Sequence, residues 1–211
     1  MSGICDEYSD LDEADVTVRE LLTEIKDKSG VIVDLAYASL MYDSHDMAKK
    51  VGELKEDMEG LEHAIRVKML LAVRTMEEAK QLSGILQVVS AAERISRSAA
   101  NIAELIDLPS EKKPFIIRIL CESDEKFDIV RISEGSDMVG NTLGQLAIEA
   151  CTGTRVIALK SRRGWIYDPD DGMKIHAGDD IVVRGLDEGF LRLKDFTTGK
   201  CPWEFPDTEK S

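Results

Sequence analysis

The sequence predicts an α+β protein with two domains, and three observations lead to this expectation. Residues 14–106 carry apolar residues at helical spacing and contain few helix-breaking residues. Residues 134–185 alternate short β-rich segments with glycine-containing turns. Between these two regions, prolines and charged residues occupy the segment 109–114. We therefore expect a helical domain over 14–108, a linker over 109–114, a small α/β domain over 115–196 and a tail over 197–211.

The helical tract divides most simply into three long helices. Residues 42–46 supply the first break, with Asp43 or Ser44 as N-cap, and Arg74-Thr75 precede an acidic first turn of the third helix. Connections this short predict an antiparallel bundle. The positions expected to face its core are Val18, Leu21, Ile25, Ile32 and Leu35, then Met47, Val51, Leu54, Met58, Leu61, Ile65 and Met69, then Leu82, Ile85, Val89, Ala92, Ile95, Ala99, Ile102 and Ile106.

The second predicted helix has a particular rhythm, because its apolar residues recur at alternating spacings of four and three. This rhythm is typical of a bundle core or a coiled-coil seam. We interpret the stripe of Met47, Met58 and Met69 first as bundle core or dimer seam, and second as an adaptable groove for a partner.

The C-terminal region is expected to contain short strands around one short helix. Residues 115–120 and 127–132 are interpreted as strands, and alternation in the second of them places Arg131 on the opposite face from Val130 and Ile132. Gly140, Asn141 and Thr142 are expected to form a turn and the N-cap of a helix that Gly153 ends. A hairpin over 156–167, a loop over 168–172 and a strand over 181–183 follow. The order is helix, strand, return strand, loop, strand.

Composition limits the classes of partner and compartment. The chain has 41 acidic and 27 basic residues, a formal charge of −14, which argues against nonspecific binding of nucleic acid or of anionic lipid. Its apolar stretches are shorter than the roughly 20 residues that cross a bilayer, and residues 1–10 lack a signal-peptide pattern. The cysteines are scattered and are expected to be reduced thiols. We expect a cytoplasmic protein with no nucleic-acid partner and no membrane insertion of its own.

Four short motifs in the C-terminal region resemble those of the TrkA-C (RCK-C) domain of potassium-uptake regulators. They are Gly140-Asn141-Thr142-Leu143-Gly144-Gln145-Leu146, then Gly153 to Lys160, then Pro169-Asp170, then Gly178 to Gly185. Each motif alone is weakly specific, but four in order over some fifty residues are typical of this family. Lys160 stands where the family usually has arginine, which keeps the charge but not the planar, bidentate contact.

The segment Ala92 to Glu104 is similar to a helix of PhoU proteins, the helical-bundle regulators of phosphate uptake. The similarity covers about half of a PhoU chain, because PhoU repeats a three-helix unit. In that family, carboxylates one turn apart on a helix hold metal ions through oxygen ligands. Here Glu53 and Asp57 keep this spacing, whereas Arg97 follows Glu93 where an aspartate is expected. The resemblance makes Glu53, Asp57 and Glu93 the candidate metal ligands, but we expect no divalent metal because the guanidinium repels a cation and can pair with these carboxylates.

Basic residues in the C-terminal region run against the acidic composition of the chain. Arg155, Arg162 and Arg163, with Lys160 and Lys174, cluster around the predicted hairpin, either as a solvated hairpin tip or as an anion site. In the TrkA-C family some members hold cyclic di-AMP between two copies of the domain, and the resemblance makes Arg131 and Asn141 the nearest candidates for such contacts. The candidate ligand-binding residues are therefore Arg131, Asn141, Arg155, Arg162 and Arg163, for cyclic di-AMP or another nucleotide.

The functional expectation is a regulator and not an enzyme. The sequence contains neither a Gly-x-Gly-x-x-Gly nor a Walker pattern, and no recognisable set of nucleophile, base and orienting group. Both resemblances imply an accessory module of a transport system. We expect a homodimeric cytoplasmic subunit that responds to a ligand through its TrkA-C domain and docks on a membrane cation channel or transporter, with potassium as the ion. The alternative is a free-standing PhoU-type regulator of phosphate signalling that binds metal or a small ligand.

Overall fold

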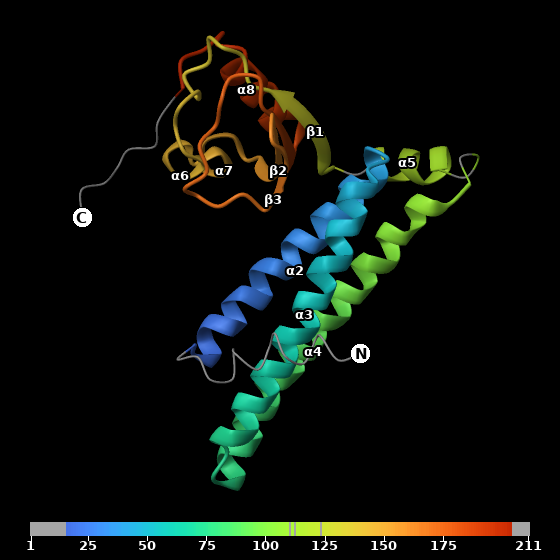
Figure 1. The fold of residues 1–211 in the computed structure, drawn as a ribbon, viewed down its shortest axis with the longest axis vertical. Coiled ribbons are helices and arrows are strands. Elements are labelled where there is room, and N and C mark those ends of the chain that lie inside the picture. Colours follow the sequence, from blue (N-terminus) through green and yellow to red (C-terminus); the bar gives the residue numbers. More distant parts are fainter. Residues whose placement is uncertain (1–15, 110, 112, 123, 204–211) are drawn as a thin grey trace. The chain divides into compact units, whose positions relative to one another are not determined.

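The computed structural model describes residues 16–109, 111, 113–122 and 124–203, and the chain divides into two compact units between Pro109 and Ser110 (Figure 1). One unit contains three long helices and the other contains a four-stranded sheet with short helices. The predicted fold class, a helical bundle followed by a small α/β domain, is confirmed.

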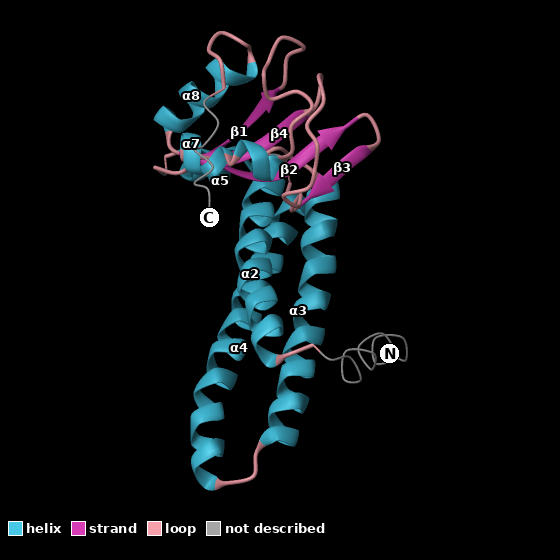
Figure 2. Cartoon of the chain, turned by 90° about the vertical axis from the view of Figure 1, so that its left-hand side faces the viewer, coloured by secondary structure: helices cyan, strands magenta, loops and turns pink. Residues whose placement is uncertain are grey.

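The helical unit consists of α2 (Val18–Met41), α3 (His45–Ala72) and α4 (Met76–Ala103), and the short 3-10 helix η1 (Glu104–Asp107) continues α4. All three long helices pack against one another in antiparallel succession (Figure 2). The connections between them, of three residues each, force each helix to reverse direction, as the sequence predicted.

Side-chain caps fix where each long helix begins. The Ser44 hydroxyl accepts the backbone N–H of Met47 at the start of α3. Thr75 and Glu78 form a capping box at the start of α4, and Thr17 and Glu20 form another at the start of α2. The hydrogen bonds that the Thr17 backbone and side chain donate lower the pKa of Glu20. These caps satisfy amide groups that have no partner within the helix.

The apolar stripe of α3 forms the centre of the bundle. Met47, Met58 and Met69 are buried, as are the other residues of the four-three rhythm: Val51, Leu54, Leu61 and Ile65. The interpretation of the methionine stripe as bundle core is confirmed, and this stripe is not available as a seam to a second chain.

The predicted core face of α4 was wrong at Ile95, which is 47% exposed. Ala92 and Ala99 are buried as predicted, and Glu93 and Ser96 are buried beside them on the face that packs against α2 and α3. Small residues on this face let the helices approach closely, and the contact surface is rotated away from Ile95.

The second unit is built on an antiparallel sheet with strand order β1-β4-β2-β3. Its strands are β1 (Lys126–Arg131), β2 (Arg155–Ser161), β3 (Gly164–Tyr167) and β4 (Asp180–Gly185). Val130 and Ile132 are buried and the Arg131 side chain is exposed, which confirms the predicted alternation. The hairpin joining β2 and β3 turns at Arg162 and Arg163, also as predicted.

The strand predicted over residues 115–120 is wrong, because the structure has a helix there, α5 (Lys113–Cys121). The segment is a continuous apolar run, and such a run has no periodicity that separates a strand from a helix. Pro114 lies in the first turn of α5, where its fixed φ and its missing N–H are tolerated.

Short helices complete the second unit. Thr142 caps α6 (Leu143–Leu146), and Gly153, with φ of 73°, ends α7 (Ile148–Thr152), as expected. The predicted single helix is broken at Ala147, whose φ is 43°. The helix α8 (Asp187–Thr197) follows β4. In the predicted tail, Trp203 is buried against Phe196, and residues 204–211 lie outside the described part of the chain.

Among the helices in the described segments, none has the length and apolar character required to cross a bilayer.

Candidate ligand-binding site

A groove on the second unit contains Arg155, one of the predicted ligand-binding residues. The groove has a volume of about 430 Å³ and lies between the α6–α7 segment, the start of β2 and the loop after β3. Its charged residues are Arg155, Glu149, Asp168 and Asp171. Its other lining residues are Leu143, Gly144, Ala147, Ile148, Ala150, Val156 and Pro169. The groove therefore combines one cation, three carboxylates and an apolar surface.

Close contact between α6 and the loop forms one wall of this groove. The backbone N–H of Gly144 donates to the Asp171 carbonyl at 2.9 Å. A Cβ at position 144 would lie 3.0 Å from the Asp171 Cβ, so the approach requires a glycine or a shift of the loop. The left-handed backbone at Ala147, between α6 and α7, lies in the groove lining as well.

Arg155 is the charged residue with the clearest capacity to bind an anion. It lies opposite Arg184 in the β2–β4 ladder, and Arg184 pairs with Glu125 at 3.5 Å. Within the described residues, Arg155 forms no hydrogen bond or ion pair. Like charges at directly opposite positions of a ladder destabilise each other. An anion bound by the Arg155 guanidinium would relieve this repulsion and use its planar, bidentate donors.

A second, larger cleft contains the residues at the tip of the hairpin. Its volume is about 600 Å³, its charged side chains are Arg162, Arg163, Lys174 and Asp179, and His176 lines it as well. Arg155 and Arg162 lie seven positions apart along an extended strand, a distance of about 20 Å. The basic cluster predicted from the sequence is therefore two separate regions. Lys160 belongs to neither cleft lining, because its ammonium lies 5.1 Å from the centre of the Trp165 ring.

Arg131 and Asn141 do not line either cleft. The Arg131 side chain is 72% exposed, and its Nε lies 3.5 Å from Oδ1 of Asp180. The Asn141 side chain donates from Nδ2 to the backbone carbonyl of Asp137 at 2.8 Å, and the backbone carbonyl of Asn141 accepts the N–H of Ile175. These contacts give Asn141 a role in the turn before α6.

The predicted metal ligands of the bundle are all paired with basic side chains. Oε2 of Glu53 lies 3.1 Å from Nζ of Lys50, and Oδ2 of Asp57 lies 3.2 Å from Nζ of Lys28 on α2. Glu93 pairs with Arg97. The sequence analysis had named Glu93 as one of the possible partners of the Arg97 guanidinium. In the described residues, no group of three or more carboxylate, histidine or cysteine side chains has the arrangement of a metal site.

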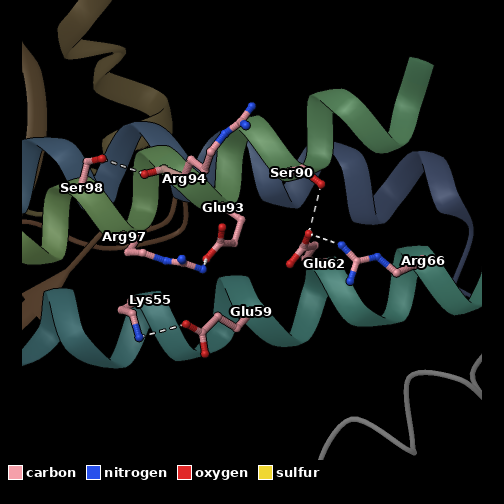
Figure 3. A network of polar contacts seen from close by, with 9 residues as sticks. All are labelled: Lys55, Glu59, Glu62, Arg66, Ser90, Glu93, Arg94, Arg97 and Ser98. Carbon is pink, nitrogen blue, oxygen red and sulfur yellow. Dashed lines mark hydrogen bonds and ion pairs between the residues drawn. The ribbon is translucent and has the colours of Figure 1, made fainter. Parts of the chain in front are cut away.

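Ion pairs within α3 and within α4 line the junction of these two helices, and a hydrogen bond from Ser90 to Glu62 joins them (Figure 3). Glu62 accepts from Arg66 and from the Ser90 hydroxyl of α4. Lys55 pairs with Glu59 at 2.9 Å, and the Glu93–Arg97 pair lies nearby (Figure 3). Carboxylates that could face a cation are thus committed to basic neighbours.

The sequence analysis missed the acidic residues of the Arg155 groove. Glu149 comes from α7, whereas Asp168 and Asp171 come from the loop after β3, and no linear motif connects the two segments. The φ of 50° at Asp168 also has no sequence signal beyond the turn composition of its loop.

Comparison with known families gives two matches along the chain. The model of the PhoU domain matches residues 22–106, and the model of the TrkA-C domain matches residues 129–197. No functionally curated protein matches the chain.

Several solved structures are similar to parts of the chain. The RCK_C domain dimer of S. agalactiae BusR in complex with c-di-AMP is 23% identical and has a TM-score of 0.35. The match covers 37% of this chain and 96% of that domain. The RCK C domain of the potassium transport protein KtrA, also in complex with c-di-AMP, is 22% identical over 41% of this chain and 98% of that chain, with a TM-score of 0.33.

A longer BusR structure contains its busAB-promotor DNA. It is 14% identical, covers 82% of this chain and 97% of that chain, and has a TM-score of 0.34. That protein has a nucleic-acid partner, which we did not expect for the present chain. The expectation for this chain stays a prediction.

The order of the two matched regions agrees with the two units of the structure. The first match lies within the three-helix unit, and the second covers the sheet and its short helices. This chain therefore carries an N-terminal PhoU domain followed by a TrkA-C domain.

Proposed function

We propose that the chain is a cytoplasmic regulatory subunit that binds a nucleotide through a homodimer of its TrkA-C domain and thereby regulates a potassium channel or transporter. The observation that carries this proposal is Arg155, an arginine that lies in a groove of that domain and has no hydrogen-bond or ion-pair partner among the described residues. Both matched families are regulatory, which favours a control function over catalysis.

The composition of the groove favours a nucleotide over a simple anion. The Arg155 guanidinium can bind a phosphate, and the carboxylates of Glu149 and Asp171 can accept hydrogen bonds from the exocyclic amine of a base. The apolar residues of the lining offer contact area to a flat ring. Inorganic phosphate alone would meet three carboxylates for one guanidinium and would bind weakly.

Coupling to a transporter requires that the ligand prefers one state of the dimer. A ligand with equal affinity for two arrangements of the protein changes nothing, whereas preferential binding shifts their populations. A ligand shared by two TrkA-C domains would have such a preference, because it binds only the arrangement that brings both grooves within reach.

Calorimetric titration of the full chain tests the ligand. We choose cyclic di-AMP as first probe, because two of the similar TrkA-C type domains are in complex with it. We expect saturable binding that weakens about tenfold or more in Arg155→Ala. Arg163→Ala, an exposed arginine of the other cleft, is the matched control and should bind as the wild type does. Absence of saturable binding for cyclic di-AMP, ATP and cyclic mononucleotides would refute the nucleotide site.

The transport role needs a separate measurement. Affinity capture from membranes followed by potassium-flux assays, with and without the protein and the nucleotide, should identify a channel or transporter whose flux depends on both. A flux that does not respond to the protein would contradict this part of the proposal. Titration with Mg²⁺ and Mn²⁺ addresses the PhoU-type alternative, and we expect no saturable binding because Glu53, Asp57 and Glu93 are already paired with cations.

A further inference from the structure

The helix α4 carries a second apolar stripe that lies outside the bundle core. Val88 is 64% exposed, Ile95 is 47% exposed, and Ile102, which is half-buried, follows at the same spacing of seven residues. Between them, also seven residues apart, are three small residues: Gly84, Ala91 and Ser98. The combined spacing of four and three is that of a coiled-coil seam. We call these six residues the α4 seam.

The fully buried residues of α4 do not include any residue of the α4 seam, although Ala91 and Ile102 are half-buried. The side of α4 that faces α2 and α3 is formed by buried residues at other positions: Val89, Ala92, Glu93, Ser96, Ala99 and Ala103. Gly84 is informative, because a Cβ at this position would meet no atom within 4 Å. Glycine in a helix interior costs about 1 kcal/mol relative to alanine, and no contact within the described chain requires it here. A helix of another chain that packed closely against this side of α4 would require the glycine at position 84.

The seam has a pattern that is complementary to itself. When two copies of α4 run antiparallel and are centred at position 93, each large residue faces a small one. Ile102 faces Gly84 of the second copy, Ile95 faces Ala91, and Val88 faces Ser98, with the same pairs repeated by symmetry. An isologous, two-fold interface has this reciprocal property. We infer that the α4 seam is a homodimer contact in which the α4 helices of two chains pack closely and antiparallel.

The size of the seam predicts a weak contact. From position 84 to position 102, a helix is about 27 Å long. A single helix pair of this length buries less than the roughly 1,200 Å² of stable protein interfaces. Such a contact gains strength when another interaction holds the two chains together, because the second association is then intramolecular. The inference itself depends only on the α4 surface and does not depend on the nucleotide groove.

Arg94 provides a test of helix direction. Its side chain extends from α4 on the side away from α3 (Figure 3), next to the proposed two-fold axis. In the antiparallel arrangement the two Arg94 side chains lie close together and repel each other. Arg94→Gln should therefore strengthen the dimer and weaken its dependence on salt. A parallel arrangement keeps these residues on opposite flanks and predicts no gain.

Sedimentation equilibrium of the full chain measures the contact. We expect Val88→Glu combined with Ile95→Glu to raise the dimer dissociation constant about tenfold or more, since the charges would be buried at the seam. Leu71→Glu is the matched control, because Leu71 is 79% exposed on α3 and lies outside the seam. Gly84→Leu should weaken the dimer while its circular dichroism and melting temperature stay at or above wild-type values, which separates the contact from folding.

A photo-crosslinking residue at position 88 of the full chain tests the register directly. In a mixture of ¹⁴N and ¹⁵N protein, we expect adducts between chains that map around Ser98 of the second copy, and none from a crosslinker at position 71. Adducts to position 88, or adducts only within one chain, including to residues 1–15, would overturn the inference. A chain that dimerises and binds cyclic di-AMP but gives no adduct at α4 would refute the seam and leave the TrkA-C proposal intact.

Discussion

The guanidinium of Arg97 on α4 pairs with the carboxylate of Glu93 one helical turn earlier, and the Glu93 side chain is only 9% exposed. A carboxylate at this depth requires a counter-ion or several hydrogen bonds. In a PhoU-type metal site the opposite charge would come from a cation, whereas here the chain supplies it.

This pair predicts the effect of removing the arginine. Arg97→Met should lower the free energy of unfolding by about 1–3 kcal/mol, because Glu93 loses its counter-ion while it stays buried. Urea denaturation at low protein concentration measures the change. Arg94→Met is the matched control and should change stability by less than about 0.5 kcal/mol. The double substitution Glu93→Leu and Arg97→Leu should recover most of the loss, and a double variant as unstable as the single one would contradict this account.

A second prediction concerns alkaline pH. Burial lowers the pKa of Lys28, but hydrogen bonds and charges from Glu24 and Asp57 outweigh burial and raise this pKa above its ordinary value. A raised folded-state pKa stabilises the fold fully below the unfolded pKa of about 10.4, and the contribution is lost as the pH rises through the folded pKa.

Urea denaturation of Lys28→Met between about pH 8 and about pH 11 checks this sign. The variant should be less stable than the wild type by roughly 0.5–1 kcal/mol at the lower pH, and the difference should shrink toward the higher pH. Lys26→Met is the control, since Lys26 is 83% exposed and should show little difference at any pH. A difference that grows with pH would contradict the prediction.

The sequence predicted the helical unit well because its signals are strong and local. The breaks at Ser44 and Thr75 contain capping residues, and the rhythm of α3 leaves one solution for its buried face. The exposure of Ile95 was not predictable in the same way. Position 95 belongs to one of two apolar stripes on α4, and only the packing of α2 and α3 decides which stripe they cover.

The limits of the site prediction have a similar cause. Arg155 was found because of its charge, but its acidic neighbours come together only through the fold of the α6–α7 segment and the loop after β3. The helix at α5 was missed because a short apolar run is compatible with either secondary structure. The structure places Arg131 and Asn141 outside the two clefts. Their roles as ligand contacts stay predictions.

A third prediction follows from the tight contact of Gly189 on α8. A Cβ at this position would lie 2.6 Å from the Thr152 carbonyl oxygen and 2.9 Å from Cγ2 of Thr154. Gly189→Ala should therefore destabilise the TrkA-C domain by about 1–3 kcal/mol. Gly52→Ala on α3, where the added Cβ meets nothing within 4 Å, should instead stabilise the bundle by about 0.5–1 kcal/mol. Thermal denaturation of both variants tests the contrast, and equal melting temperatures would refute it.

A fourth prediction concerns Trp203, whose ring lies edge-on to Phe196 with the ring centroids 4.7 Å apart. The Trp203 side chain is buried, and within the described residues its Nε1 has no hydrogen-bond partner. Trp203→Ala should cost about 3 kcal/mol, mostly through lost packing. Trp203→Phe should cost less than about 1.5 kcal/mol, because it keeps a ring and removes an unpaired donor. Chemical denaturation measures the free energy of unfolding of both variants. Equal losses for Trp203→Ala and Trp203→Phe would contradict the prediction that a phenyl ring preserves most of the packing.

The two hydrophobic cores have no residue in common, since one extends from Leu21 to Ala92 and the other from Val130 to Trp203. Each half can therefore melt as its own cooperative unit, and scanning calorimetry of the full chain should resolve two heat-absorption peaks. Arg97→Met would move one peak and Gly189→Ala the other. A nucleotide bound at Arg155 would raise the melting temperature of the peak that Gly189→Ala identifies, so the calorimeter itself assigns the ligand to one half of the chain.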